Sequence, residues 1–262
     1  MPVPPEFARP DGAIPIALVT GAARRIGREL ALALAEEGFR LALHHHHSAA
    51  EAADLAQEIA AAGHPAPLLC KADLSNPAET GAMFDALPAC PAILVNNASL
   101  FQEDRLGALD RALWQRQMAV NLLAPALLTD CLARRRAEGE QALIVNMSDA
   151  KLAAPNPDFF SYTISKVGLA GVTELAARAL APHVRVNAIA PSVTLVSGPQ
   201  SRANFERAHV LNPLQRGVVA ADLARALLFL VHTPTITGQT LVIDAGQRFL
   251  SLPRDVQYMI EP

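Results

Sequence analysis

The chain lacks any hydrophobic run close to the roughly 20 residues that a membrane-spanning helix needs. Its longest apolar stretches are short segments such as 226–231. Residues 1–13 mix prolines with charged residues and contain no apolar segment of the kind found in signal peptides. These absences predict a soluble, cytoplasmic protein.

Cysteine is scarce and cationic charge is not in excess. The three cysteines, Cys70, Cys90 and Cys131, are odd in number and form no Cys-x-x-Cys pair, which argues against a disulfide framework and a zinc site. The net charge of −3 offers no basic stripe for a nucleic-acid backbone. We therefore expect a reducing compartment and a small-molecule substrate, with no nucleic acid and no membrane as partners.

The sequence does contain a regular alternation of short apolar runs with longer segments of helical period. This alternation predicts an α/β fold, a Rossmann-like doubly wound parallel sheet of about seven strands with helices on both faces. The expected strands lie near 15–20, 40–45, 67–71, 92–96, 142–147, 184–189 and 240–244.

The chain is long enough for one sizeable α/β domain and shows no repeat or linker. We predict a flexible N-terminal tail over 1–13 and a single domain over 14–262. The stretch 97–141 is expected to hold one long helix after a loop. The stretch 190–218 is rich in Pro, Ser, Asn and Gly, which predicts a mobile substrate loop. For 246–262, after the last strand, the hypothesis is packing across a subunit boundary.

A glycine turn follows the first expected strand. The apolar residues 16–20 lead into Gly21, and Gly27 stands just before a helical run that begins at Arg28. A strand, a glycine turn and a helix N-terminus form a cradle for a pyrophosphate, because the helix end offers unpaired N–H groups and positive potential. A tight turn without function is the alternative. Further candidate cofactor contacts in this turn are Arg24, Arg25 and Ile26.

The second expected strand ends at His44 and continues as three more histidines and a serine. In NAD-specific folds an acidic residue here binds the ribose 2′-hydroxyl, whereas a 2′-phosphate needs cationic or donor groups. No acid is present, and Arg24, His46, His47 and Ser48 can surround a phosphate instead. NADP(H) is therefore the preferred cofactor, and NAD(H) stays an alternative.

The four consecutive histidines also suggest a metal site, since imidazole is a common ligand of transition metals. Adjacent strand residues point in alternating directions, however, and no nearby Cys or second His cluster completes a coordination shell. We predict no metal.

Polar residues also follow the third and fourth expected strands. These are Asp73 with Leu74, and Asn96 followed by Asn97, Ala98 and Ser99. They stand where the carboxyl ends of strands meet a dinucleotide in such sheets. Each alone can be a helix cap or a turn residue, but together they follow one crevice.

Tyr162 and Lys166 stand four residues apart at the start of a helical pattern, so they share one face. A nearby ammonium favours the phenolate, so we expect the Tyr162 pKa to lie below its usual value of about 10, toward a pH at which the phenol delivers a proton. Upstream, an expected strand ends at Ser148 and Asp149, which brings a short polar side chain to the tyrosine. A solvated helix face is the alternative for the pair alone.

Together these residues resemble the short-chain dehydrogenase/reductase family across nearly the whole chain. The resemblance rests on the 21–27 turn, Asp73, 96–98, Asn121, the Tyr162/Lys166 pair, and 237–239 with Asp244. It implies a nicotinamide cofactor and hence a dinucleotide-binding catalytic domain. It further implies Tyr162 as proton donor, Lys166 on the ribose, Asn121 holding a proton-relay water, and a homotetramer or homodimer.

Departures from the common family pattern point to a narrower group. Arg25 replaces the usual middle glycine of the turn, Asp149 replaces the usual catalytic serine, and Ser99 follows Ala98 where glycine is commoner. With Phe101, these residues resemble the pteridine reductases and, more loosely, the bacterial dihydromonapterin reductases. The resemblance implies an NADPH-dependent reductase that transfers hydride to a dihydropterin or a dihydrofolate-like substrate.

The expected substrate contacts are Arg25, Ser99, Phe101, Asp149 and Tyr162. A flat pterin ring can be sandwiched between the nicotinamide and Phe101, although Phe101 as core filling is the alternative. Asp149 can bind the amino-pyrimidine edge or share a proton with Tyr162. Arg25 can offer fork-like donors to pterin or phosphate oxygens.

Two matches to the pteridine reductases fail. His47 stands where the eukaryotic enzymes carry an arginine, which predicts weaker or pH-dependent affinity for the 2′-phosphate. The usual Pro-Gly after the sixth strand reads Pro191-Ser192. We still expect Pro191, Ser192 and Thr194 to contact the cofactor.

Two other functions stay open. The chain can be a short-chain carbonyl reductase or alcohol dehydrogenase acting on a ketone, sugar or 3-oxoacyl substrate, because a shared fold does not fix the substrate. Asp149 argues against this alternative. A catalytically silent NADP(H) sensor or scaffold is the other, and a phenol with a neighbouring lysine argues against it.

Overall fold

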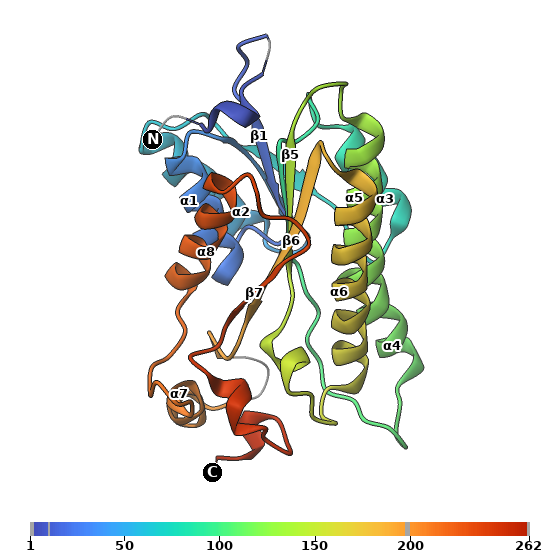
Figure 1. Ribbon diagram of the computed structural model, residues 1–262, viewed down its shortest axis with the longest axis vertical. Coiled ribbons are helices and arrows are strands. Elements are labelled where there is room, and N and C mark those ends of the chain that lie inside the picture. Colours follow the sequence, from blue (N-terminus) through green and yellow to red (C-terminus); the bar gives the residue numbers. More distant parts are fainter. Residues whose placement is uncertain (1–2, 10, 197–199, 261–262) are drawn as a thin grey trace.

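The computed structural model describes residues 3–9, 11–196 and 200–260. Seven strands form one parallel sheet in the order β3-β2-β1-β4-β5-β6-β7, which confirms the predicted α/β fold (Figure 1). The strands are β1 Ile16–Val19, β2 Arg40–His45, β3 Leu68–Lys71, β4 Ile93–Asn96, β5 Ala142–Met147, β6 Val184–Pro191 and β7 Thr240–Ile243.

Helices cover both faces of the sheet. On one face lie α1 Arg25–Glu36, α2 Ala49–Ala61 and α8 Ala220–His232. On the other lie α3 Pro77–Asp85, α4 Arg111–Met118, α5 Ala124–Arg135 and α6 Phe160–Leu180 (Figure 1). The short helices are η1 Pro5–Phe7, η2 Ala119–Leu123, η3 Ala150–Ala153, η4 Gln247–Leu250 and η5 Val256–Tyr258.

The two layers of helices explain why the strands read as unbroken apolar runs. In β1, Val19 packs into the cluster under α1 and α8, whereas Leu18 packs into the cluster under α3 and α5. Successive strand side chains point to opposite faces, so a strand covered on both sides needs apolar residues at every position. The helices themselves show the amphipathic period, as Leu30 and Leu34 of α1 do.

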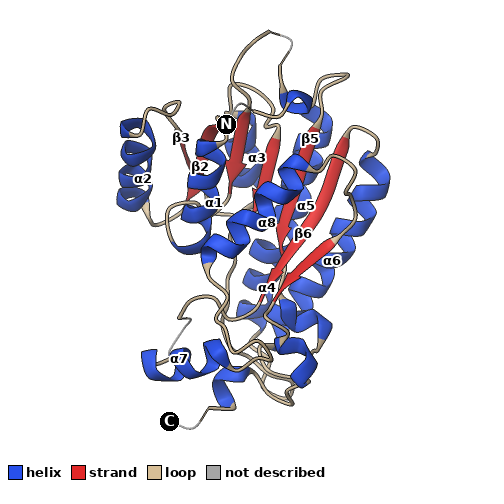
Figure 2. Ribbon diagram, turned by 60° about the vertical axis from the view of Figure 1, so that its left-hand side comes forward, coloured by secondary structure: helices blue, strands red, loops and turns tan. Residues whose placement is uncertain are grey.

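The order of the strands fixes where a ligand can bind. Strand β1 pairs with β2 on one side and β4 on the other, so the chain reverses its direction of winding at β1. The crossovers leave a crevice outside the carboxyl ends of the strands at this reversal point. Figure 2 shows α7 (Arg202–Val210) and the C-terminal segment lying beyond that end of the sheet, apart from the two helical layers.

One helical expectation is confirmed and one needs correction. The stretch 97–141 holds a loop and then an unbroken helical run, in which α4 and α5 are joined by the π-helical turn η2, because Pro125 has no N–H for the carbonyl four residues earlier. The expected loop over 190–218 contains the helix α7, and its residues 197–199 lie outside the described residues. Helix α7 is held by tertiary contact, since Asn204 Nδ2 donates to Gln257 O at 3.0 Å.

The N-terminal segment is anchored at two described residues, although we expected a flexible tail over 1–13. Phe7 is 3% exposed and packs edge-on against Phe39, with ring centroids 5.8 Å apart. Glu6 Oε1 forms an ion pair with Arg185 Nη2 at 2.9 Å. The proline and charged residues of this segment predict a loose tail, but its one aromatic ring, Phe7, is buried. Among the described residues, no helix combines the length and the apolar character that crossing a bilayer requires.

Candidate active site

A cavity of about 730 Å³ lies at the carboxyl ends of the strands. Its lining includes these predicted site residues: Gly21, Arg24, Arg25, Ile26, Gly27, His46, His47, Ser48, Asn97, Ala98, Ser99, Phe101, Asp149, Tyr162, Lys166, Pro191, Ser192 and Thr194. Asp73, Leu74 and Asn121 lie outside this lining. Asp73 instead accepts hydrogen bonds from the backbone and the hydroxyl of Ser75, as a turn residue does.

The glycine turn after β1 is pressed against the end of β4. A Cβ on Gly27 would lie 2.2 Å from Gly21 O and 2.6 Å from Asn97 Nδ2. Asn97 Nδ2 donates to Thr20 O and Gly21 O, which fixes the turn to β4. This close packing turns the N-terminus of α1 toward the cavity, where its N–H groups suit a pyrophosphate.

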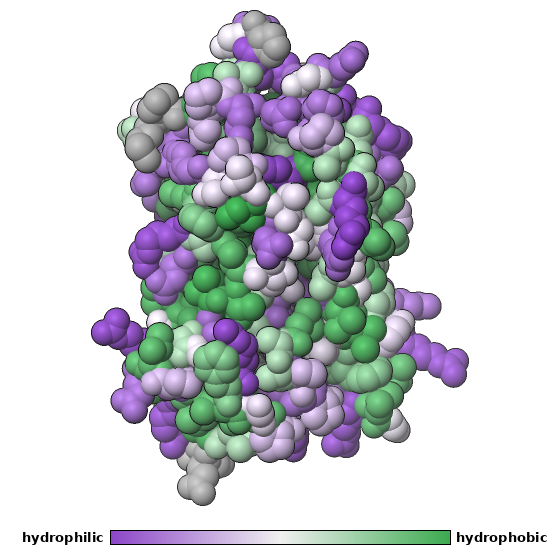
Figure 3. Space-filling view, in the orientation of Figure 1, coloured by the Kyte–Doolittle hydropathy of each residue, from purple (hydrophilic) through white to green (hydrophobic). Residues whose placement is uncertain are grey.

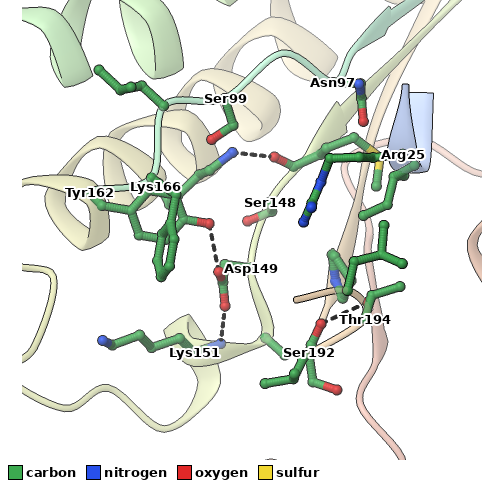
Figure 4. Close-up of a pocket in the computed structure, with 18 of the residues that line it drawn as sticks. Arg25, Asn97, Ser99, Ser148, Asp149, Lys151, Tyr162, Lys166, Ser192 and Thr194 are labelled. Carbon is green, nitrogen blue, oxygen red and sulfur yellow. Dashed lines mark hydrogen bonds between the residues drawn. The ribbon is translucent and has the colours of Figure 1, made fainter. Parts of the chain in front are cut away.

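Arg25 adopts a backbone conformation that ordinarily favours glycine. Its φ is +59°, which for an arginine stores strain of order 1 kcal/mol. Its Nη1 donates to Val196 O at 2.8 Å and so ties the turn to the segment after β6. In Figure 4 the Arg25 side chain lies across the cavity from Tyr162.

The histidines after β2 divide into a structural member and cavity-lining members. His44 Nδ1 accepts a 3.0 Å hydrogen bond from Gly21 N, and its other nitrogen lies 3.2 Å from Ala72 O. Burial lowers the pKa of His44 to about 4, so this ring is neutral and supports the glycine turn. His46 and His47 both line the cavity, and the centroids of their rings lie 3.6 Å apart.

The described residues contain no group of three His, Cys, Asp or Glu side chains arranged to hold a metal ion. Arg24, also in the lining, forms an exposed 3.3 Å ion pair with Glu51. His46 and His47 after β2, together with Arg24 in the glycine turn after β1, therefore offer imidazole and guanidinium donors to an anion in the cavity.

Asn121 is fully buried and positions the segment after β4. Its Oδ1 accepts from Leu100 N at 2.7 Å, and its Nδ2 donates to Leu100 O at 2.9 Å and to Ser165 Oγ at 3.0 Å. These bonds tie the residues around Ser99 to α6. The side chain thus acts through its neighbours, and the proton-relay water implied by the family resemblance stays a prediction.

Three reactive side chains meet where β5 ends and α6 begins (Figure 4). Tyr162 Oη donates a 2.6 Å hydrogen bond to Asp149 Oδ2. Lys166, one helical turn further on, donates from Nζ to Met147 O at 2.7 Å. Its ammonium lies 5.6 Å from the centroid of the Tyr162 ring. The predicted grouping of Tyr162, Lys166 and Asp149 is therefore present in the structure.

The expected direction of the Tyr162 pKa shift is wrong for this arrangement. Burial, and then the negative charge of Asp149, raise the pKa of Tyr162 well above its usual value. Burial also lowers the pKa of Lys166 to about 8, and its ammonium donates to a backbone carbonyl. Tyr162 is consequently a protonated phenol, the form from which a proton can be given.

Phe101 lies beside these residues. Its ring stacks on Phe159 with centroids 4.1 Å apart and meets Tyr162 edge-on at 4.7 Å. Both the core and the ligand interpretations of Phe101 thus have support, because the ring packs on an aromatic neighbour and also lines the cavity. Its stacking on a flat ligand stays a prediction.

The lining also contains residues that sequence reasoning missed. The C-terminal strap, residues 251–258, folds over this chain's own cavity, and its packing across a subunit boundary stays a prediction. Arg254 Nε donates to both carboxylate oxygens of Asp158, at 2.8 and 2.9 Å. Lys151 also lines the cavity. No local motif marks these residues, since the strap follows the last strand and its partners precede α6.

Comparison with known proteins agrees with this geometry. A family model described as enoyl-(acyl carrier protein) reductase matches residues 21–248. The crystal structure of FolM alternative dihydrofolate reductase 1 from Brucella canis, complexed with NADP, has a TM-score of 0.86 and 39% identity, covering 94% of this chain and 97% of that one.

Two further relatives are named for different activities. Pteridine reductase 1 of Leishmania tarentolae is 32% identical over 277 residues, covering 88% of this chain and 96% of that protein. The 3-oxoacyl-(acyl carrier protein) reductase FabG of Staphylococcus aureus is 30% identical over 238 residues, with 88% and 96% covered.

Proposed function

Because this chain belongs to the short-chain dehydrogenase/reductase family, we propose that it is an NADPH-dependent reductase that transfers hydride to a dihydropterin or a dihydrofolate-like substrate. The observation that carries the proposal is the 2.6 Å hydrogen bond from Tyr162 to Asp149. Reduction of a ketone needs only a neutral hydroxyl beside the phenol, whereas a carboxyl suits a substrate rich in N–H groups.

The residues of the cavity fit NADPH. The N-terminus of α1, which the close contact of Gly27 with Gly21 turns toward the cavity, would receive the pyrophosphate. Arg24, His46, His47 and Ser48 would surround the 2′-phosphate, and Lys166 would hold the ribose of the nicotinamide. When bound, the cofactor supplies the hydride. The crystal structure of the Brucella canis relative contains NADP, which supports this assignment.

Tyr162 supplies the proton that completes the reduction. With the hydride supplied to the carbon of the substrate C=N bond, the phenol would protonate the nitrogen, so that one C–H and one N–H bond form and the Tyr162 O–H bond breaks. Asp149 accepts the Tyr162 hydrogen bond and orients the phenol toward the cavity. The phenolate left behind regains its proton from solvent, so that each turnover consumes one proton from water.

We further propose a homotetramer or homodimer working in the cytoplasm. Hydrophobic residues gather over α8 and β7 on the face seen in Figure 3, and Phe229 of α8 is 50% exposed. An exposed apolar patch on a folded protein marks an interaction surface. The three cysteines are free and buried, which fits a reducing compartment.

The proposed function is tested by a substrate panel. NADPH oxidation is followed with dihydrobiopterin, dihydromonapterin and dihydrofolate, beside simple ketones and a 3-oxoacyl thioester. We expect turnover of at least one of the three pterin substrates, with NADPH preferred to NADH. Turnover of ketones or 3-oxoacyl thioesters alone would instead assign the chain to the FabG-like activity of its other relatives.

A further inference from the structure

A second carboxylate, Asp255, reaches the substrate end of the cavity from the C-terminal strap. Asp255 lines the same cavity as Asp149 and Tyr162, and its side chain is 19% exposed. Its negative charge contributes, after burial and Asp149, to the raised pKa of Tyr162. The reduction mechanism itself makes no use of this group.

The two carboxylates differ in how far their oxygens are already engaged. Asp149 Oδ2 accepts from Tyr162 Oη at 2.6 Å, and its Oδ1 accepts from Lys151 N at 2.8 Å. Asp255 Oδ1 accepts a longer bond of 3.2 Å from Gln257 N. Asp255 Oδ2 lies 3.7 Å from Lys151 Nζ, beyond hydrogen-bonding distance.

Lys151 forms a long ion pair of 3.7 Å with Asp255, and its ammonium also serves a second acceptor. Lys151 Nζ donates to Asp158 O at 2.5 Å. Burial raises the pKa of Asp255, as expected of a carboxylate that is removed from water with incomplete hydrogen bonding. A buried carboxylate in this state gains when a ligand brings N–H donors.

The strap holds Asp255 in a fixed place. Asp158 accepts from Arg254 Nε at 2.8 and 2.9 Å and from the backbone N of Asp255 at 2.7 Å. These bonds join the strap to the loop before α6, the helix that carries Tyr162. A carboxylate positioned by bonds of this kind can recognise a ligand with little loss of conformational entropy.

We propose that Asp255 is a substrate-recognition residue that binds the 2-amino-4-oxopyrimidine edge of a pterin. The 2-amino group and the neighbouring ring N–H point in parallel and match the two oxygens of a carboxylate. Both oxygens of Asp149 already accept a short bond, from Tyr162 and from Lys151 N, so Asp255 has the greater free acceptor capacity for this edge while the reacting C=N bond faces the phenol. This inference rests on the proposed function.

Two ligands that differ only at this edge test the proposal. Pterin carries the 2-amino group, whereas lumazine carries an oxygen in its place and is otherwise the same bicyclic ring. Binding of each is measured by ligand fluorescence on the full-length protein saturated with NADP⁺. We expect the unaltered protein to bind pterin about 10- to 100-fold more tightly than lumazine. Equal affinities would overturn the proposal without any variant.

Asp255→Asn then tests the contribution of the carboxylate alone, since the amide oxygen of the asparagine can still accept from Gln257 N. We expect this variant to lose most of the preference for pterin while its affinities for lumazine and NADP⁺ change little. Asp130→Asn, at an exposed residue paired with Arg134, is the matched control and keeps the preference. The assignment is contradicted if Asp255→Asn keeps the preference for pterin, or if its affinities for pterin and lumazine fall equally.

The experiment also separates the two claims. If the unaltered protein reduces dihydropterins but binds pterin and lumazine alike, the proposed function stands and the role of Asp255 falls. If the protein reduces no dihydropterin and binds neither ligand, the proposed function itself is wrong.

Discussion

The phenol of Tyr162 and the carboxylate of Asp149 are joined by a 2.6 Å hydrogen bond inside the cavity. Asp149 follows β5 and Tyr162 lies in the first turn of α6, so the fold brings the two together at the carboxyl end of the sheet. The phenol is the donor, because the pKa of Tyr162 is raised by burial and by Asp149. The proposed chemistry depends on this pair.

Tyr162→Phe removes the proton donor and leaves the ring in place. We expect kcat for dihydropterin reduction to fall by about 10²- to 10⁴-fold, the usual contribution of a positioned acid. The affinity for NADP⁺, measured by fluorescence titration, should change little. A variant that retains wild-type kcat would show that the phenol gives up no proton in the rate-limiting step.

The raised pKa of Tyr162 can be read directly, because the chain contains only two tyrosines. In a Tyr258→Phe background, the tyrosinate absorbance reports Tyr162 alone. We expect no ionisation until the pH is well above 10, since burial and Asp149 both disfavour the phenolate. Adding Asp149→Asn should move the titration to lower pH. Ionisation near or below pH 10 in the Asp149-containing protein contradicts the arrangement.

The lowered pKa of Lys166 predicts the alkaline limit of cofactor binding. The amine is charged below its pKa of about 8 and neutral above it, so contacts made by the ammonium are lost as pH rises through 8. We expect the affinity of the free protein for NADP⁺ to fall over this interval. The measurement runs from pH 7 to 10, above the usual titration range of histidine. A flat profile would exclude a binding role for the charged form.

Gly27→Ala should damage the cofactor turn. The added Cβ would stand 2.2 Å from Gly21 O, and overpacking of this kind costs about 1–3 kcal/mol of unfolding free energy. NADP⁺ affinity should fall as well. Gly81→Ala in α3 is the matched control, because a Cβ there meets no atom within 4 Å and the change should stabilise the protein by about 0.4–1 kcal/mol. Denaturant melts of both variants give the comparison.

Asp104 positions the start of the catalytic helix. Its buried carboxylate accepts from Ser161 N at 2.8 Å and from the Ser161 hydroxyl. Asp104→Ala leaves these donors unsatisfied, which costs about 1–3 kcal/mol of stability. We expect kcat to fall while KM for NADPH is unchanged, because Tyr162 lies next in the chain.

Asp104→Asn keeps an oxygen for Ser161 N and should recover part of kcat. If both variants lose stability alone, with kcat intact, Asp104 is a structural cap and does not position the phenol.

The sheet was predictable from the sequence because its signals are local. A parallel strand buried on both faces, such as 142–147, reads as an apolar run, and the crossovers read as amphipathic helices. Helix α7 was missed because it lies in a Pro- and Gly-rich stretch and is held by the bond from Asn204 to the strap. The long helix within 97–141 was predicted, but its π-helical turn was not, because one proline changes the hydrogen-bond register without breaking the helical period.

Part of the site followed from position and part did not. Asp149 and Tyr162 were found because strand ends and a helical spacing place them, without any long-range contact. Asp255 was missed because it reaches the cavity only when the chain end folds back onto Lys151 and Asp158. The direction of the Tyr162 pKa shift was misjudged because the sequence shows only that a lysine lies one turn away. It shows neither the burial of Tyr162 nor the hydrogen bond from the Lys166 ammonium to Met147 O.

The transfer of hydride to a pterin is tested most directly by isotope labelling. NADPH carrying deuterium at its transferable position is incubated with the protein and a dihydropterin or dihydrofolate, and the reduced product is examined by mass spectrometry. The account predicts a tetrahydro product that carries one carbon-bound deuterium, formed about 10²- to 10⁴-fold more slowly with Tyr162→Phe. A dihydropterin recovered unlabelled and unreduced, beside a ketone that does acquire the label, would contradict it.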